Sequence, residues 1–133
     1  MAQVPSGSIR VVSAEIQRRG NYLICQRYAK AVLPLLWEFP GGRVREGQTD
    51  KDRLVEAVRH RIGVHAIVGE LLLEKVHSYA EYDVTLVVYR CTIDGEPWDN
   101  NVNAVAWVAP EDFADYPFPG ADQQTVAQLL EDA

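Results

Sequence analysis

The stretch that most constrains the fold of this chain is a glycine-rich segment that leads into an amphipathic one. Residues 37–48 contain the paired glycines Gly41 and Gly42, which favour a tight turn because glycine permits backbone angles closed to other residues. A helix is predicted next, starting at Thr49, whose hydroxyl can cap free backbone N–H groups, and ending at Gly63. A turn, a charged loop and a helix in this order favour a functional site where the loop meets the helix.

The predicted helix has two distinct faces. Leu54, Val58 and Ile62 recur every fourth residue and form an apolar face that predicts packing against a core. At about 100° per residue, a second set of side chains lies together beside this face: Arg53, Ala57, His60 and Arg61. The second face is neutral to positive, so it repels a divalent cation and offers it no oxygen. Glu56 is expected at a solvated edge away from this face, paired with Arg59 or His60.

The rest of the chain predicts a single α/β domain. A hairpin turn is expected at Gly20, a short helix is expected to start at Pro110, and a final helix is expected over 121–130. Alternating or β-branched segments predict the strands: 9–18, 22–27, 64–79, 82–93 and 104–109. Mixed strands with a central and a C-terminal helix give an α/β/α sandwich with a mixed β-sheet over residues 1–133, of which 1–8 are expected to be flexible.

Composition and charge limit the class of protein. Hydrophobic residues make up 47% of the chain and charged residues 24%, as in ordinary soluble globular proteins. A net charge of −6 argues against nucleic acid as a partner, because nucleic acid favours basic surfaces. No apolar run approaches the roughly 18 residues that cross a bilayer, and no signal peptide is evident, so we expect a cytoplasmic protein without a membrane partner. Cys25 and Cys91 lie in apolar runs, which predicts two buried, reduced thiols.

The segment WEFPGGRVREGQ and the later EAVRHRIGV resemble the Nudix box, the loop–helix motif of a family that cleaves a nucleoside diphosphate linked to another group. The spacing and both ends match the family pattern, whereas the residue types between them differ. The first glutamate of the pattern falls at Gln48 and its arginine falls at Glu56. The three helix glutamates fall at Ala57, His60 and Arg61. LICQR and AVAWVAPEDFADYPFPGADQQTVAQLL are similar to the MutT-like branch that cleaves single nucleotides. The resemblance also implies the α/β/α sandwich.

The missing carboxylates lead to a prediction about function. The family's helix carboxylates hold Mg²⁺, which polarises a phosphate and activates water. With a degenerate box, this chain is predicted to be a pseudoenzyme that binds a nucleotide or nucleotide-like molecule without a cofactor, in a sensing or scaffold role, because guanidinium groups bind phosphate bidentately. The alternative is an active pyrophosphohydrolase on a nucleoside triphosphate or a nucleoside diphosphate derivative, using Mg²⁺ with Glu46 and Glu56 as acids. A third alternative is an interaction module with a protein partner, or a homodimer.

The candidate ligand-binding residues come from the helix and from the resemblance. The charge of the helix face contributes three of them: Arg53, His60 and Arg61. The retained pocket features add three more: Phe39, Gly41 and Gly42. The resemblance adds Arg27, which matches an arginine that contacts the nucleotide, and Asp122, which falls where the branch places an Asn or Asp against the base. Asn101 falls about where many members carry a further catalytic acid. No metal-ligating residue is predicted.

Overall fold

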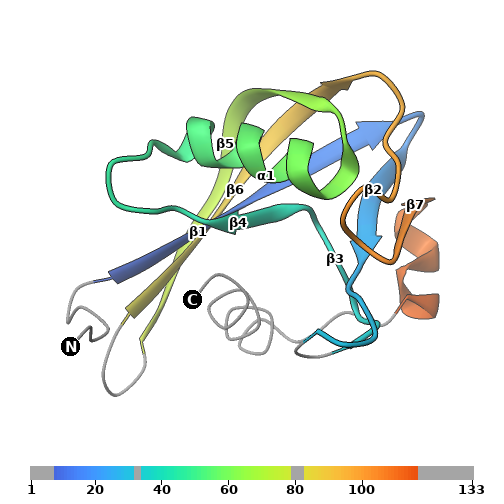
Figure 1. The fold of residues 1–133 in the computed structure, drawn as a ribbon, viewed down its shortest axis with the longest axis horizontal. Helices are drawn as coiled ribbons and strands as arrows, with labels where there is room; N and C mark the ends of the chain where they lie inside the picture. The colour runs from blue at the N-terminus through green and yellow to red at the C-terminus, as the bar shows by residue number, and fades with distance from the viewer. Residues whose placement is uncertain (1–7, 32–33, 79–82, 117–133) are drawn as a thin grey trace.

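The computed structural model describes residues 8–31, 34–78 and 83–116 (Figure 1). Within these residues the chain forms seven strands, one α-helix and one 3₁₀-helix. In chain order they are β1 (Ser8–Arg18), β2 (Asn21–Gln26), β3 (Trp37–Glu38), β4 (Gly41–Arg43), α1 (Asp50–Ile62), β5 (His65–Ser78), β6 (Asp83–Asp94), β7 (Ala104–Val108) and η1 (Pro110–Asp115). The helix predicted over 121–130 lies outside the described residues.

The strands form one mixed sheet in the order β3-β2-β1-β6-β5, with β4 paired to β1 and β7 paired to β2. β1 runs parallel to β6 from Ser8↔Asp83 to Ile16↔Cys91, and the other pairs are antiparallel. The predicted hairpin between β1 and β2 is confirmed, with Gly20 in the left-handed region at φ 82°. The mixed sheet of an α/β fold is therefore present as predicted.

Helix α1 lies across one face of the sheet (Figure 1). Leu54, Val58 and Ile62 are fully buried in the main core cluster, as their spacing predicts. That cluster includes alternate residues of β1, such as Val12, because successive side chains of a strand point to opposite faces. Val11 points the other way and joins a second cluster. The sheet thus buries apolar side chains on both of its faces.

Both predicted ends of α1 are confirmed. The Thr49 hydroxyl accepts a hydrogen bond from the Asp52 backbone N–H at 3.1 Å and caps the first turn. Gly63 lies in the left-handed region at φ 73°, and its N–H donates to the Arg59 carbonyl at 2.9 Å. These caps fix the register of the helix relative to the loop that precedes it.

The predicted tight turn at the paired glycines is wrong. Gly41 and Gly42 lie in strand β4, and neither has a positive φ. They are needed instead for close approach: a Cβ on Gly41 would lie 2.1 Å from the Val12 carbonyl oxygen, and a Cβ on Gly42 would lie 2.4 Å from Arg53 Nη2. Gly41 therefore lets β4 pair with β1, and Gly42 leaves room for an arginine of the helix.

Two further features concern the sequence predictions. Cys25 and Cys91 are buried and are not joined in a disulfide, as expected. In the described part of the chain, no helix has the length and apolar character that a membrane span requires.

Candidate functional site

A cavity of about 490 Å³ opens beside α1. Its walls come from the loop after β2, the loop between β4 and α1, one face of α1, and the loop before β7. The lining residues are Tyr28, Arg45, Arg53, Glu56, Ala57, His60, Arg61 and Asn101. A loop and a helix thus build the cavity together, where the sequence predicts a site.

The predicted grouping of side chains on α1 agrees with this cavity. Arg53, Ala57 and Arg61 are four residues apart, so they share one side of the helix, and all three are mostly buried. His60 lies next to them and is exposed. Asn101 also lines the cavity, at the place where the resemblance puts a further acid.

Glu56 is exposed, as predicted, but it lines the cavity and pairs with Arg53 instead of Arg59 or His60, which corrects the prediction of its partners and of a place away from the site. Its Oε1 accepts a hydrogen bond from Arg53 Nη1 at 2.8 Å and one from Gln48 Nε2 at 3.2 Å. Arg45 Nη1 lies 3.8 Å from the same oxygen. The Arg53 hydrogen bond is the main cause that lowers the pKa of Glu56 below its ordinary value. Two guanidinium groups and an amide therefore converge on one carboxylate oxygen.

Arg61 is anchored behind the cavity by two oxygens. Its Nε donates to the Gly41 carbonyl at 2.8 Å, and its Nη1 lies 3.9 Å from Oε2 of Glu38. Glu38 is only 1% exposed and also pairs with Arg27, whose Nη1 lies 3.4 Å from Glu38 Oε1. A buried carboxylate between two guanidinium groups holds both in place, because separating such a pair leaves an uncompensated charge.

Sequence reasoning missed the role of Glu38. The signal was present, since an acid between Trp37 and Phe39 lies in a largely apolar segment. Its partners, Arg27 and Arg61, are 11 and 23 positions away, so no local pattern connects the three.

The loop before β7 is fastened to the last turn of α1. The Trp98 and Asn101 backbone N–H groups donate to the Ile62 and Arg61 carbonyls, each at 3.0 Å. The Asn100 side chain donates to the His60 carbonyl at 2.9 Å. These bonds satisfy carbonyls that a helix end leaves without intrahelical partners. The Asn101 side chain contacts the His60 ring and accepts from the Tyr28 hydroxyl, so this wall of the cavity is tied together.

Several candidate residues do not line the cavity. Arg27 is buried beside Glu38, and Phe39 meets the edge of the Phe113 ring at a centroid distance of 6.3 Å. Gly41 and Gly42 lie behind Arg61 and Arg53, which they help to position. Glu46 is exposed in the loop before α1. Asp122 lies outside the described residues. The roles predicted for these residues, acid catalysis for Glu46 and ligand binding for the others, stay predictions.

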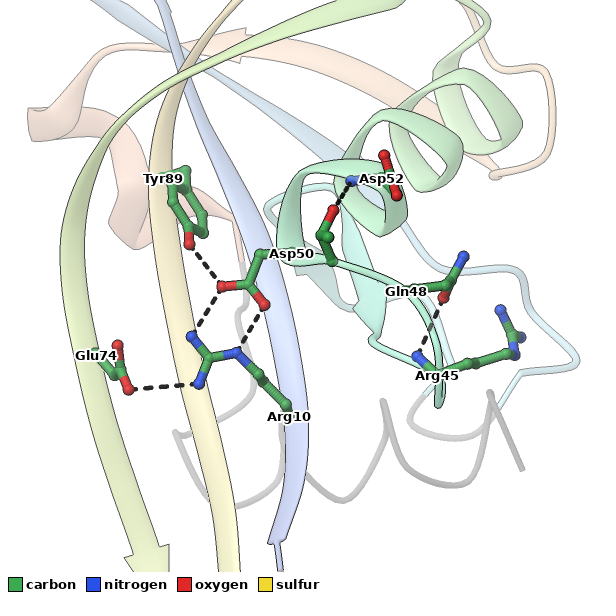
Figure 2. A network of polar contacts seen from close by, with 8 residues as sticks. Arg10, Arg45, Gln48, Asp50, Asp52, Glu74 and Tyr89 are labelled. Atoms are coloured by element: carbon green, nitrogen blue, oxygen red, sulfur yellow. Dashed lines mark hydrogen bonds and ion pairs between the residues drawn. The ribbon is translucent and has the colours of Figure 1, made fainter.

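Figure 2 shows a second polar network, at the start of α1. Arg10 of β1 donates to both oxygens of Asp50, at 2.7 and 2.8 Å, and the Tyr89 hydroxyl of β6 donates to Asp50 at 2.6 Å. Arg10 also reaches Glu74 of β5 at 3.4 Å. The Arg10 hydrogen bonds are the main cause that lowers the pKa of Asp50. This network fixes the first turn of α1 to three strands.

The residues of the cavity do not fit the Mg²⁺ that the resemblance implies. Mg²⁺ requires oxygen ligands, usually carboxylates, in octahedral geometry. Ala57, His60 and Arg61 offer no carboxylate, and the nearby oxygens of Gly41 and Glu38 already bind the Arg61 guanidinium. Glu56 brings one carboxylate, but its Oε1 already accepts from Arg53 and Gln48. Across residues 8–31, 34–78 and 83–116, no three His, Cys, Asp or Glu side chains gather closely enough to hold a metal ion.

Comparison with known proteins gives consistent matches along most of the chain. A family model described as NUDIX domain matches residues 11–128. The CTP pyrophosphohydrolase of Escherichia coli strain K12 is 31% identical over 115 residues, covering 86% of this chain and 85% of the relative. The 8-oxo-dGTP diphosphatase of the same strain is 26% identical over 130 residues, covering 96% and 95%. The solution structure of the E. coli ORF135 protein matches with a TM-score of 0.76 and 28% identity, covering 98% of this chain and 94% of the other.

Proposed function

The chain belongs to the Nudix family, and on that premise we propose that it binds the phosphate chain of a nucleotide in the cavity beside α1. Arginine charge takes the place of a divalent ion, and hydrolysis is slow or absent. One observation carries the proposal: Arg45 and Arg53 converge on a single anionic oxygen, that of Glu56, inside a cavity that Arg61 also lines. Guanidinium groups arranged in this way suit a phosphate oxygen equally well.

Size and surroundings support a nucleotide as the ligand class. A volume of about 490 Å³ is within the usual range for small-molecule sites. Tyr28 adds an aromatic ring to the lining, and aromatic rings stack on bases. The two relatives from E. coli are named for CTP and for 8-oxo-dGTP, which are both nucleoside triphosphates. A protein partner or a homodimer stays a prediction.

The test is binding of CTP, 8-oxo-dGTP and tripolyphosphate by isothermal titration, in EDTA and again in Mg²⁺. We expect binding in EDTA, because the arginines supply the positive charge. An Arg53→Gln variant should lose about tenfold in affinity or more, as a charge-assisted hydrogen bond is removed. Arg59→Gln is the matched control, since Arg59 is an exposed arginine of the same helix that does not line the cavity. Binding that requires Mg²⁺, or equal affinity in both variants, would contradict the proposal.

The second candidate function is hydrolysis of a nucleoside triphosphate or a nucleoside diphosphate derivative. The relatives favour it over a silent domain, because the CTP pyrophosphohydrolase and the 8-oxo-dGTP diphosphatase are named as enzymes. The candidate catalytic acids are Glu56, which lines the cavity, and Glu46, which lies in the loop before α1. The test is turnover of a nucleotide panel with Mg²⁺ and with Mn²⁺. Wild-type turnover that disappears in the Glu56→Gln and Glu46→Gln variants would support this function. Wild-type turnover no higher than that of the two variants would exclude it.

A further inference from the structure

Among the described residues that line the cavity, Glu56 alone carries a carboxylate, and it lies beside an arginine that is far more buried. The Arg53 side chain is 9% exposed, whereas that of Glu56 is 54% exposed. The guanidinium of Arg53 lies against Gly42, where a Cβ would come within 2.4–2.9 Å of its atoms. Gly42 therefore closes one side of Arg53, and Glu56 contacts Nη1 of this guanidinium within the cavity.

The contacts of Glu56 are those that a phosphate oxygen would make. Its Oε1 receives Arg53 Nη1 at 2.8 Å and Gln48 Nε2 at 3.2 Å, with Arg45 Nη1 at 3.8 Å. The pKa of Glu56 is lowered, chiefly by Arg53, so the carboxylate carries its charge at neutral pH. An anion that approaches Arg53 and Arg45 meets a negative charge already bound to them.

We propose that Glu56 is an internal counter-anion that a ligand's phosphate must displace, and that it thereby lowers the affinity of the cavity for every phosphate ligand by a constant factor. The inference rests on the proposed function, since it assumes that phosphate binds beside Arg53. Displacement breaks the same contacts whichever ligand enters, so the factor is the same for short and long phosphate chains. The exposed side chain of Glu56 can rotate into solvent without disturbing the buried arginine.

The experiment measures the affinity of Glu56→Gln for pyrophosphate and for tripolyphosphate by isothermal titration in EDTA. Removing the charge should tighten binding of both by about two- to fivefold, the range expected for an ion pair that is partly screened by solvent. Glu56→Ala is a second variant, because it excludes a new hydrogen bond from the introduced amide. Melting curves of each variant check that the fold is retained.

Asp52→Asn is the matched control. Asp52 is an exposed acid on the same helix, it does not line the cavity, and its replacement removes the same charge. We expect less than about a twofold change, because an exposed charge is screened by solvent and salt. An equal gain in this control would show a general charge effect and would overturn the inference.

The remaining outcomes separate the inference from the proposed function. If the wild type binds both anions in EDTA but the Glu56 variants bind no more tightly, the inference alone fails. If neither the wild type nor the variants bind in EDTA, both fail. If binding needs Mg²⁺ and is lost in Glu56→Gln, Glu56 is a metal ligand, which also overturns the inference.

Discussion

Gly41 and Gly42 are adjacent in β4, and each leaves space for a different neighbour. A Cβ on Gly42 would meet the end of the Arg53 side chain, which can move, whereas a Cβ on Gly41 would meet the Val12 backbone, which cannot move without disturbing β1. The two positions therefore allow the placement of Arg53 to be separated from the stability of the sheet.

We expect Gly42→Ala to displace the Arg53 guanidinium, so that tripolyphosphate affinity in EDTA falls about as far as in Arg53→Gln, while the melting temperature changes little. Gly41→Ala should lower the free energy of unfolding by about 1–3 kcal/mol, because overpacking against backbone strains the pairing of β4 with β1. Titration and denaturant unfolding of both variants give the measurements. A Gly42→Ala protein with wild-type affinity would show that Arg53 does not need its observed position.

The sequence predicted which residues share one face of α1, but it did not predict the ion pairs that hold their side chains in place. Helical spacing brings Arg53 and Arg61 together, so their place in the cavity could be foreseen. The pairing of Arg53 with Glu56 and of Arg61 with Glu38 could not, because several cations compete for each acid and only three-dimensional distances decide between them.

Among the elements, α1 is positioned at its start by the Asp50 network of Figure 2. An Asp50→Asn variant loses the charge-assisted bonds to Arg10 and the favourable acid in the first helical turn. Since Arg10 is 35% exposed, solvent screening limits the expected loss to about 1–2 kcal/mol of unfolding free energy at pH 7. Urea unfolding measures this difference, with Tyr89→Phe expected to cost less because only one hydrogen bond to Asp50 is lost.

The same variant predicts a pH dependence. The pKa of Asp50 is lowered in the folded protein from its ordinary value of 3.8. Its contribution to stability is therefore present in full above the unfolded value and is lost as the pH falls through the folded value. The stability gap between wild type and Asp50→Asn should stay constant from neutral to mildly acid pH and close below about pH 3.8. A gap that persists at still lower pH would mean that the carboxylate charge is not its cause.

Element prediction succeeded where a pattern was long enough to show a period. Helix α1 has thirteen residues with a capping hydroxyl and a terminal glycine, and strands β1 and β6 have eleven and twelve residues. Strands β3 and β4 have two and three residues, too few for alternation to appear, and the paired glycines of β4 suggested a turn instead. They form only because β2 and β1 present free strand edges to them.

Both cysteines of the protein lie in the core, where Cys25 is 1% exposed and Cys91 is 3% exposed. Burial raises the pKa of the Cys91 thiol to about 11, which further reduces the thiolate that reacts. We expect Ellman's reagent at pH 8 to modify the native protein no faster than it unfolds globally, and to modify both thiols at once in denaturant. Reaction of one thiol well before unfolding would reveal local opening of β2 or β6.

The α/β architecture could be predicted from the order of the elements, since mixed strands around an amphipathic helix have few ways to cover an apolar face. The sequence predicted only part of the cavity. Its helix wall was predicted, whereas Tyr28 and Arg45 come from loops whose path depends on contacts far along the chain, such as the bond from Tyr28 to Asn101.

The buried pair of Glu38 and Arg61 limits how this protein can diverge further. An acid introduced at position 61 would face Glu38, which Arg61 Nη1 now approaches to 3.9 Å, and would add a second negative charge beside a carboxylate that is 1% exposed. A change of charge at position 61 is therefore expected to require a matching change at position 38, so Glu38 and Arg61 should be replaced together rather than one at a time.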